Sequence, residues 1–142
     1  MSDFIDFLVT GQQLRRLYDR ILNQVGEEYG LGRQELDVLL FLKNNPDYDM
    51  AKDIVEYRGL AKSCVSRGID LLVKKGYLEA KADQKDRRLV HLKLLPEAGE
   101  AAQAACHAQR RCIEILYKGL TEEEKKMMSS ICLLYTSAAS LQ

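Results

Sequence analysis

The order of apolar and polar residues predicts a mostly helical chain. Apolar side chains recur at spacings of three and four residues in six stretches, which places them on one face of a helix. In the first stretch this face consists of Leu14, Leu17, Tyr18, Ile21, Leu22 and Val25. We therefore expect helices over residues 4–28, 33–43, 50–58, 62–75, 96–118 and from residue 121 onwards.

A different period appears between residues 78 and 94. Apolar and polar residues alternate there on both sides of a charged turn, with the apolar positions at Leu78, Ala80, Ala82, Val90, Leu92 and Leu94. This alternation predicts an antiparallel hairpin. A short helix, a turn at Gly59-Leu60, a second helix and a hairpin are the parts of a winged helix-turn-helix. The predicted fold class is therefore mainly α with a small β-hairpin wing.

Residues at the predicted helix ends indicate how two helices begin. Asp49 precedes the third helix and is expected to be its N-cap, because an Asp side chain accepts a hydrogen bond from a free backbone N–H. Thr121 and Glu124 have the spacing of a capping box at the start of the last helix. We expect that helix to bury an apolar face made of Met127, Met128, Ile131, Leu134 and Tyr135.

The charges are unevenly distributed, although the formal net charge of the 142-residue chain is zero. Residues 61–93 contain nine basic and four acidic side chains, a net charge of +5, which leaves −5 for the remainder. A basic zone on an acidic body is typical of a surface that binds a phosphate backbone. A solvated face would show the same charges, so charge alone does not decide between the two.

Composition excludes several other classes of protein. Hydrophobic residues make up 46% of the chain, which is enough for a folded core. No apolar run reaches the length of a membrane span, and no basic secretory leader precedes an apolar run, so we expect a cytoplasmic protein without a membrane partner. The cysteines and the two histidines lack the spacing of metal ligands, so no metal or other cofactor is expected (Cys64, Cys106, Cys112, Cys132, His91, His107).

The fourth predicted helix carries the side chains that suit DNA. With Val65, Ile69 and Leu72 buried, its outward face consists of Lys62, Ser63, Ser66, Arg67 and Asp70. Small hydroxyls allow a close approach to base edges, and an Arg can bond a guanine with two hydrogen bonds. Lys74 and Lys75 at the end of the helix are suited to phosphates.

The segment "LAKSCVSRGIDLLVKKGYLEAKADQKDRRLVHLKLLPEAG", residues 60–99, resembles the MarR family of bacterial transcription regulators. The family's wing motif, Asp-x-Arg-Asp-Arg-Arg, stands here as Asp83-Gln84-Lys85-Asp86-Arg87-Arg88. The resemblance implies one domain over residues 1–142. It comprises a winged-helix DNA-binding lobe at 31–95 and a helical dimerisation region at 1–30 and 96–142.

The same resemblance implies a homodimeric repressor that places two winged helices on a palindromic operator. A small effector between the dimerisation helices and the DNA-binding lobe would change the spacing of the two lobes and hence affinity. The apolar faces of the first and last helices also suggest dimerisation from the residues themselves. They could instead pack on each other within one chain.

The wing raises a question about which side chain probes the minor groove. Lys85 replaces an Arg that the family usually places at the tip, and Lys suits a narrow groove less well because it is more strongly hydrated. Arg87 is the other candidate, and Arg88 is expected to be an anchor or a phosphate contact. Asp83 and Asp86 are expected to orient these bases. Ala61 also stands where the family usually has a Ser N-cap.

The sequence favours DNA binding over several other functions. Cys64 in the fourth helix could act as a redox switch, but packing within the fold is the favoured interpretation. Cys106 and Cys112 are expected in the core or at a dimer interface. No catalytic triad order, phosphate loop or zinc-protease motif occurs, and His91 lies mid-strand in the wing, so an enzyme is not expected. A winged helix that only contacts other proteins is disfavoured by the basic zone.

Overall fold

The computed structural model describes the backbone of residues 3–140 and the side chains of residues 3–134. Its elements, in chain order, are α1 (Asp3–Tyr29), α2 (Arg33–Asn44), α3 (Ala51–Arg58), α4 (Lys62–Lys74), β1 (Leu78–Ala82), β2 (Val90–Leu94), a 3-10 turn (Pro96–Ala98), α5 (Gly99–Tyr117) and α6 (Glu122–Ser140). The chain is therefore mainly α with a two-stranded antiparallel hairpin, as the sequence predicted.

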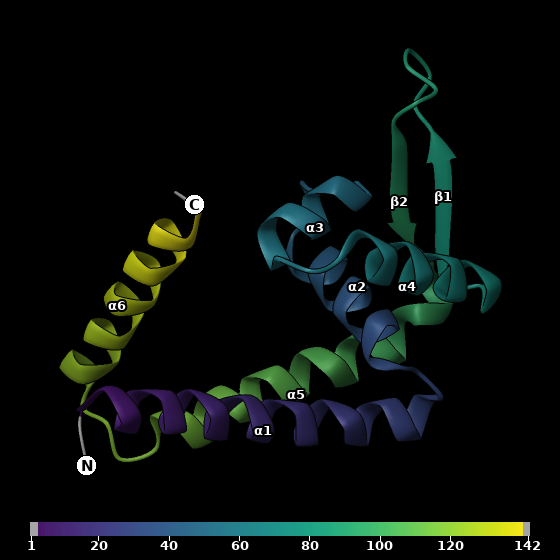
Figure 1. Ribbon diagram of the computed structural model, residues 1–142. Coiled ribbons are helices and arrows are strands. Elements are labelled where there is room, and N and C mark those ends of the chain that lie inside the picture. Colours follow the sequence, from purple (N-terminus) through teal and green to yellow (C-terminus); the bar gives the residue numbers. More distant parts are fainter. Residues whose placement is uncertain (1–2, 141–142) are drawn as a thin grey trace.

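The helices form two regions that Figure 1 shows clearly. The long helices α1 and α5 pack along each other at the base, and the lobe made of α2, α3, α4 and the hairpin stands above one end of them. The hairpin projects away from the base. Helix α6 follows the other end of α5 and stands apart from the lobe. This arrangement leaves α4 and the wing on a part of the molecule distant from the α5–α6 connection.

The core is continuous between the two regions because α2 is buried from several sides. Five of its apolar side chains have at most 5% of their surface exposed (Leu36, Val38, Leu39, Leu40, Phe41). The lobe adds Ile54, Val65, Leu72, Leu78 and Leu92, and the base adds Ile21, Leu22, Ala101, Ala102 and Ala105. Each fully buried Leu or Ile contributes about 1.5–3 kcal/mol relative to exposure, so α2 is the main anchor of the lobe.

The two strands of the hairpin pair in a register that places their apolar residues opposite one another. Leu78 pairs with Leu94, Ala80 with Leu92 and Ala82 with Val90. Leu78 and Leu92 are buried against the lobe, which fixes the base of the wing. The backbone N–H of Leu92 also donates to the carbonyl of Asp49 at 2.8 Å, so the loop before α3 flanks β2.

The structure corrects two expectations about helix ends. Asp49 does not cap α3: the N-cap position is occupied by Met50, and its backbone N–H donates to Oδ2 of Asp53 at 3.1 Å. The helix expected from Pro96 begins with a 3-10 turn and becomes α-helical at Gly99. The capping box of α6 is confirmed, because Thr121 and Glu124 each accept a side-chain hydrogen bond from the other's backbone N–H at 3.1 Å.

The expectation that α6 buries its apolar face is wrong within one copy of the chain. The exposed fractions of Met127, Ile131 and Leu134 are 59%, 46% and 70%, and Met128 is half-buried. Tyr135, the fifth residue of that expected face, lies outside the described side chains. The apolar period of α6 is present, but none of the described side chains of this copy covers the face.

Candidate nucleic-acid interface

Helix α4 is held against α2 by its buried face. Val65 and Leu72 are buried, as the sequence predicted, whereas Ile69 is only half-buried. Gly68 is also buried, and sequence reasoning overlooked it. A Cβ atom at this position would lie 2.6 Å from the carbonyl oxygen of Gln34 in α2, so a glycine is needed where the two helices approach. The only sequence signal was an unexplained Gly inside a helical pattern.

The opposite face of α4 is exposed along its whole length. It presents Lys62, Ser63, Ser66, Arg67, Asp70 and Lys74. Within the described part of the chain, the side chains of Lys62, Arg67 and Lys74 have no hydrogen-bond or ion-pair partner. These cations are therefore available to a ligand that reaches this face.

Lys75, one residue beyond α4, is engaged differently. Its ammonium group lies 2.7 Å from Oε2 of Glu35 in α2 and donates a hydrogen bond to the carbonyl of Gly30. The other oxygen of Glu35 accepts from the backbone N–H of Gly32 at 3.0 Å. Lys75 thus fastens the end of α4 to the turn between α1 and α2, and a phosphate would compete with Glu35 for it.

The turn of the wing is organised by Asp83. Its Oδ2 accepts hydrogen bonds from the backbone N–H groups of Lys85 (2.9 Å) and Asp86 (3.0 Å), and its Oδ1 lies 2.8 Å from Nε2 of His91. The bond with His91, followed by the two backbone bonds, holds the pKa of the Asp83 carboxyl below its usual range. Asp83 therefore fixes the backbone from which the basic side chains extend, rather than pairing with one of them.

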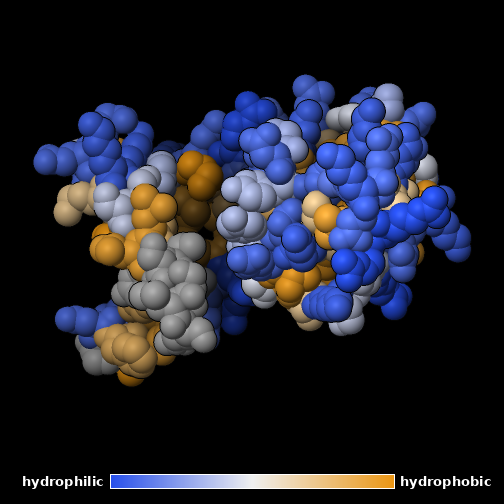
Figure 2. All heavy atoms as spheres, turned by 90° about the horizontal axis from the view of Figure 1, so that it is seen from above, coloured by the Kyte–Doolittle hydropathy of each residue, from blue (hydrophilic) through white to orange (hydrophobic). Residues whose placement is uncertain are grey.

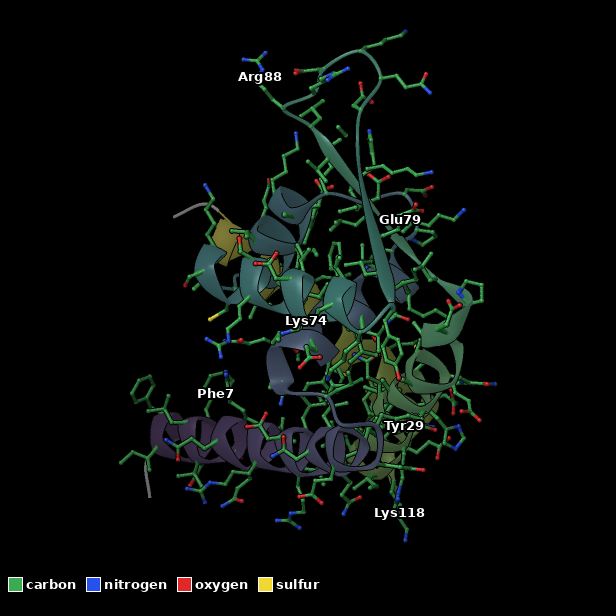
Figure 3. All side chains as sticks on the ribbon, turned by 90° about the vertical axis from the view of Figure 1, so that its right-hand side faces the viewer. Phe7, Tyr29, Lys74, Glu79, Arg88 and Lys118 are labelled. Carbon is green, nitrogen blue, oxygen red and sulfur yellow. The ribbon has the colours of Figure 1, made fainter. Side chains whose placement is uncertain are left out.

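Asp86 pairs directly with a basic residue. Its Oδ1 accepts from the backbone N–H and from Nε of Arg88, both at 3.1 Å, and its Oδ2 accepts from Nη2 at 3.3 Å. The side-chain bonds from Arg88, followed by the backbone bond, lower the pKa of Asp86. The Arg88 side chain is 91% exposed and lies at the tip of the hairpin (Figure 3).

Lys85 and Arg87 are the remaining cations of the turn. Both are exposed, and neither side chain has a partner within the part of the chain that the structure describes. Because Asp83 holds the backbone beneath them, they extend from a fixed turn without being neutralised. Figure 2 shows that the lobe surface around the wing is mainly hydrophilic, whereas apolar residues gather on the α6 side.

A network of ion pairs connects the base to the lobe. Arg33 of α2 donates to Asp19 of α1 at 2.6 Å and to Asp37 at 3.1 Å. Asp37, whose side chain is 10% exposed, also accepts from Arg58 at the end of α3, at 3.4 Å. The guanidinium of Arg33 lies 5.0 Å from the ring centre of Tyr18. Because Arg58 directly precedes the turn into α4, this network joins α1 to the start of α4.

A cavity of about 940 Å³ lies between α1, the end of α2 and α5. Its walls are largely apolar, with Leu14, Cys112, Ile113 and Leu116 among them. A hydrogen-bonded chain also contributes to the lining, since Gln109 donates to the hydroxyl of Tyr18 and accepts from Asn44, both at 2.9 Å.

None of the four cysteines forms a disulfide in the described part of the chain. Cys112 is buried, and burial raises the pKa of its thiol, which disfavours the reactive thiolate. Cys64 is half-buried in α4. Cys106 is half-buried as well, lines the same cavity as Cys112, and lies 3.6 Å from Oδ1 of Asn44.

Two classes of site are not found among the described residues. No group of three or more His, Cys, Asp or Glu side chains in residues 3–134 is placed to hold a metal ion. Within the same part of the chain, no helix combines the length and the apolar character needed to cross a membrane.

Comparison with known proteins agrees with this geometry. The sequence model of the MarR family matches residues 29–89, which include α2, α3, α4, β1 and the wing turn. No curated protein matches the chain.

Solved structures resemble the chain over almost its whole length. A MarR protein from Peptoclostridium difficile is 21% identical, with 95% of this chain and 88% of that chain covered and a TM-score of 0.83. MepR of S. aureus, solved in complex with DNA, is 18% identical (97% and 98% covered, TM-score 0.75). PcaV of Streptomyces coelicolor, solved with its natural ligand, is 21% identical (92% and 91% covered, TM-score 0.72). Residues 29–89 therefore match the sequence model of the MarR family, and the chain as a whole has the fold of MarR-type transcriptional regulators.

Proposed function

We propose that this protein binds double-stranded DNA sequence-specifically and represses transcription, with α4 in the major groove and the wing at the minor groove. The observation that carries the proposal is the pair of basic surfaces on one lobe. Unpaired cations line the outer face of α4, and Lys85 and Arg87 extend from a turn whose backbone Asp83 holds. The basic window of residues 61–93 spans both surfaces. That MepR is solved in complex with DNA supports the assignment.

Within this proposal the residues divide by their chemistry. Arg67, flanked by Ser63 and Ser66, reads base edges, because a guanidinium can bond the O6 and N7 atoms of guanine together. Lys62 and Lys74 contact phosphates, which supply affinity without sequence information. Lys75 contributes less, since a phosphate must displace Glu35. Arg88 contacts a phosphate while remaining held by Asp86.

The proposed assembly is a homodimer. Exposed apolar side chains occur at the start of α1 (Phe4, Leu8, Val9) and along one face of α6 (Met127, Ile131, Leu134). A second copy that covered these side chains would remove apolar surface from water. Two copies related by a two-fold axis would read a palindromic operator with half-sites about 10 bp apart, one helical turn of DNA.

A small apolar effector is proposed for the cavity between α1, α2 and α5. Its volume of about 940 Å³ suits a small organic molecule. An effector that displaced the Tyr18–Gln109–Asn44 chain would change how α2, and with it the lobe, sits on the base. The ligand bound to PcaV supports this class of partner. Binding of the effector is expected to lower the affinity for DNA and release the protein from it.

The test of the DNA-binding proposal is a titration of a mixed-sequence duplex at increasing salt, followed by selection of preferred sequences from a random library. Phosphate contacts predict measurable binding at low salt and a linear fall of log affinity with log salt. Arg67→Ala should cost about 1–3 kcal/mol on the selected sequence and relax its specificity. Lys118→Ala is the matched control, because it removes one cation at the opposite end of the molecule from the wing (Figure 3).

Two results would contradict the proposal at different levels. Absence of binding to any duplex at low salt would reject DNA binding and favour a winged helix that contacts only proteins. Equal operator affinity for Arg67→Ala and the unsubstituted protein would reject the placement of α4 in the groove.

A further inference from the structure

His91 of β2 lies between two carboxylates that come from different parts of the lobe. Its Nδ1 is 3.0 Å from both oxygens of Asp49, in the loop before α3. Its Nε2 is 2.8 Å from Oδ1 of Asp83, in the turn of the wing. The imidazole ring therefore bridges the tip of the hairpin and the body of the lobe.

This geometry fixes the protonation state of the ring. An ionised carboxylate only accepts hydrogen bonds, and a neutral imidazole carries a single N–H. Both contacts can be hydrogen bonds only if both nitrogens carry protons, so the bridge requires the imidazolium. The hydrogen bonds to Asp49 and then to Asp83 raise the pKa of His91 above its ordinary value. In β1 the residue opposite His91 is Lys81, whose ammonium is paired with Glu79 at 3.6 Å.

The wing has few other attachments along its outer half. An isolated two-stranded hairpin is marginally stable in water, and the buried contacts of Leu78 and Leu92 lie toward its base. In Figure 1 the hairpin extends well beyond α4, so a small change of angle at its base would move the tip considerably. Asp83 is also the residue that accepts hydrogen bonds from the Lys85 and Asp86 amides, so the bridge to His91 acts on the turn itself.

We propose that His91 is a positioning residue for the wing, tying Asp83 to Asp49 and so setting the angle at which Lys85 and Arg87 approach DNA. The part of the proposal that concerns DNA rests on the proposed DNA-binding function. The bridge itself does not, and it can be measured on the free protein.

Because the bridge requires a protonated His91, its strength should depend on pH. A histidine whose pKa is raised by its partners contributes its attachment fully below the ordinary pKa of about 6.5. The attachment is lost as the pH rises through the raised pKa, because the deprotonated ring keeps at most one of the two bonds. DNA affinity should therefore fall as the pH rises from about 6 to about 9, by roughly threefold to tenfold if the wing contact is largely lost.

The experiment compares the unsubstituted protein with three variants. His91→Gln removes the titrating ring, and Asp49→Asn removes one charge while keeping the size of the side chain. The matched control is His107→Gln, since His107 is the chain's other histidine and is exposed on α5. Three quantities are measured against pH: the imidazole titration by NMR, the hydrogen-exchange protection of the Lys85 and Asp86 amides, and affinity for a mixed-sequence duplex.

The expected results differ between the variants. His91 titrates above its ordinary pKa, and Asp49→Asn lowers that pKa. In His91→Gln the two amides lose protection at low pH, and affinity at low pH resembles that of the unsubstituted protein at high pH. The control keeps the pH slope.

A His91 pKa at or below the ordinary value, or an unchanged pH slope of amide protection in His91→Gln, overturns the proposed bridge. If the bridge is found but affinity in His91→Gln keeps the original slope, the positioning role is wrong. If no protein binds DNA at any pH, the proposed function fails, and the bridge is judged by the NMR and exchange results alone.

Discussion

Gly68 of α4 faces the carbonyl oxygen of Gln34 in α2 so closely that no Cβ atom fits between the two helices. The atom would lie 2.6 Å from that oxygen and 3.0 Å from Cγ2 of Val38. The obstacle is mainly backbone, which cannot rotate away as a side chain can. The position of α4 therefore depends on the absence of a single methyl group.

Gly68→Ala should destabilise the protein by about 1–3 kcal/mol, the usual cost of overpacking a well-filled contact. It should also weaken DNA binding, because α4 must move away from α2. Gly99→Ala is the control: Gly99 has helical φ and open space around its Cβ position. Alanine has fewer accessible conformations than glycine in the unfolded chain, so this variant should be more stable by about 0.4–1 kcal/mol. Chemical denaturation measures both, and equal stabilities would show that the helices can separate without cost.

Asp37→Ala should destabilise the lobe more than an exposed ion pair would suggest. Its carboxylate is nearly buried and pairs with both Arg33 and Arg58. Removing it leaves the guanidinium of Arg58 without a partner among the described residues and leaves Arg33 with Asp19 alone. The expected loss is about 1–3 kcal/mol in the free energy of unfolding.

Glu122→Ala provides the comparison for Asp37→Ala, because Glu122 is 85% exposed and, among the described residues, pairs with Lys125 alone. That change should cost less than about 1 kcal/mol. If the two variants unfold at the same denaturant concentration, the network between the base and the lobe does not stabilise the protein.

Ala61→Ser should stabilise the start of α4. Ala61 occupies the N-cap position with extended backbone angles, and its side chain makes no capping hydrogen bond. A serine there can accept from a free N–H in the first turn, which is worth about 0.5–2 kcal/mol. Thermal and chemical denaturation measure the gain. Unchanged stability would mean that water already satisfies these N–H groups at no cost.

The elements and the exposed face of α4 were predictable from local periodicity. The 3.6-residue period of a helix and the two-residue period of a strand both depend on residues close together in the sequence. The bridge of His91 was not, since its partners Asp49 and Asp83 meet it only after the lobe has folded, and Asp49 lies 42 positions away. The pairing of Lys75 with Glu35 was overlooked for the same reason. Periodicity revealed the apolar face of α6 but could not say which surface covers it.

Leu134→Glu should weaken the proposed dimer. Leu134 is 70% exposed in one copy, and burying a leucine is worth about 1.5–3 kcal/mol, so a charge there should raise the dissociation constant at least about tenfold. Ser129→Glu is the control, because Ser129 lies on the other side of α6 from Met127, Ile131 and Leu134. Sedimentation velocity over a range of concentrations measures the change. A monomer before substitution, or a dimer equally stable in both variants, would contradict the proposed interface.

Affinity measurements on variants of the wing can decide whether Lys85 or Arg87 enters the minor groove. Arg88 is restrained by Asp86, whereas Lys85 and Arg87 extend from the turn without a partner in the described chain. If Lys85 enters, Lys85→Arg should tighten binding with an unchanged salt slope, because the charge is kept and a guanidinium is less strongly hydrated.

The gain from Lys85→Arg should be larger on a duplex with a central A-tract, whose narrow minor groove attracts arginine, than on a G·C-rich duplex. If Arg87 enters instead, Lys85→Arg should change little. Arg87→Ala should then weaken binding, lower the salt slope by about 1 and remove the preference for the A-tract. Gln84→Ala, a neutral neighbour in the same turn, controls for disturbance of the backbone. Equal affinities of all three variants on both duplexes would exclude the wing from the minor groove and leave α4 as the only reader of sequence.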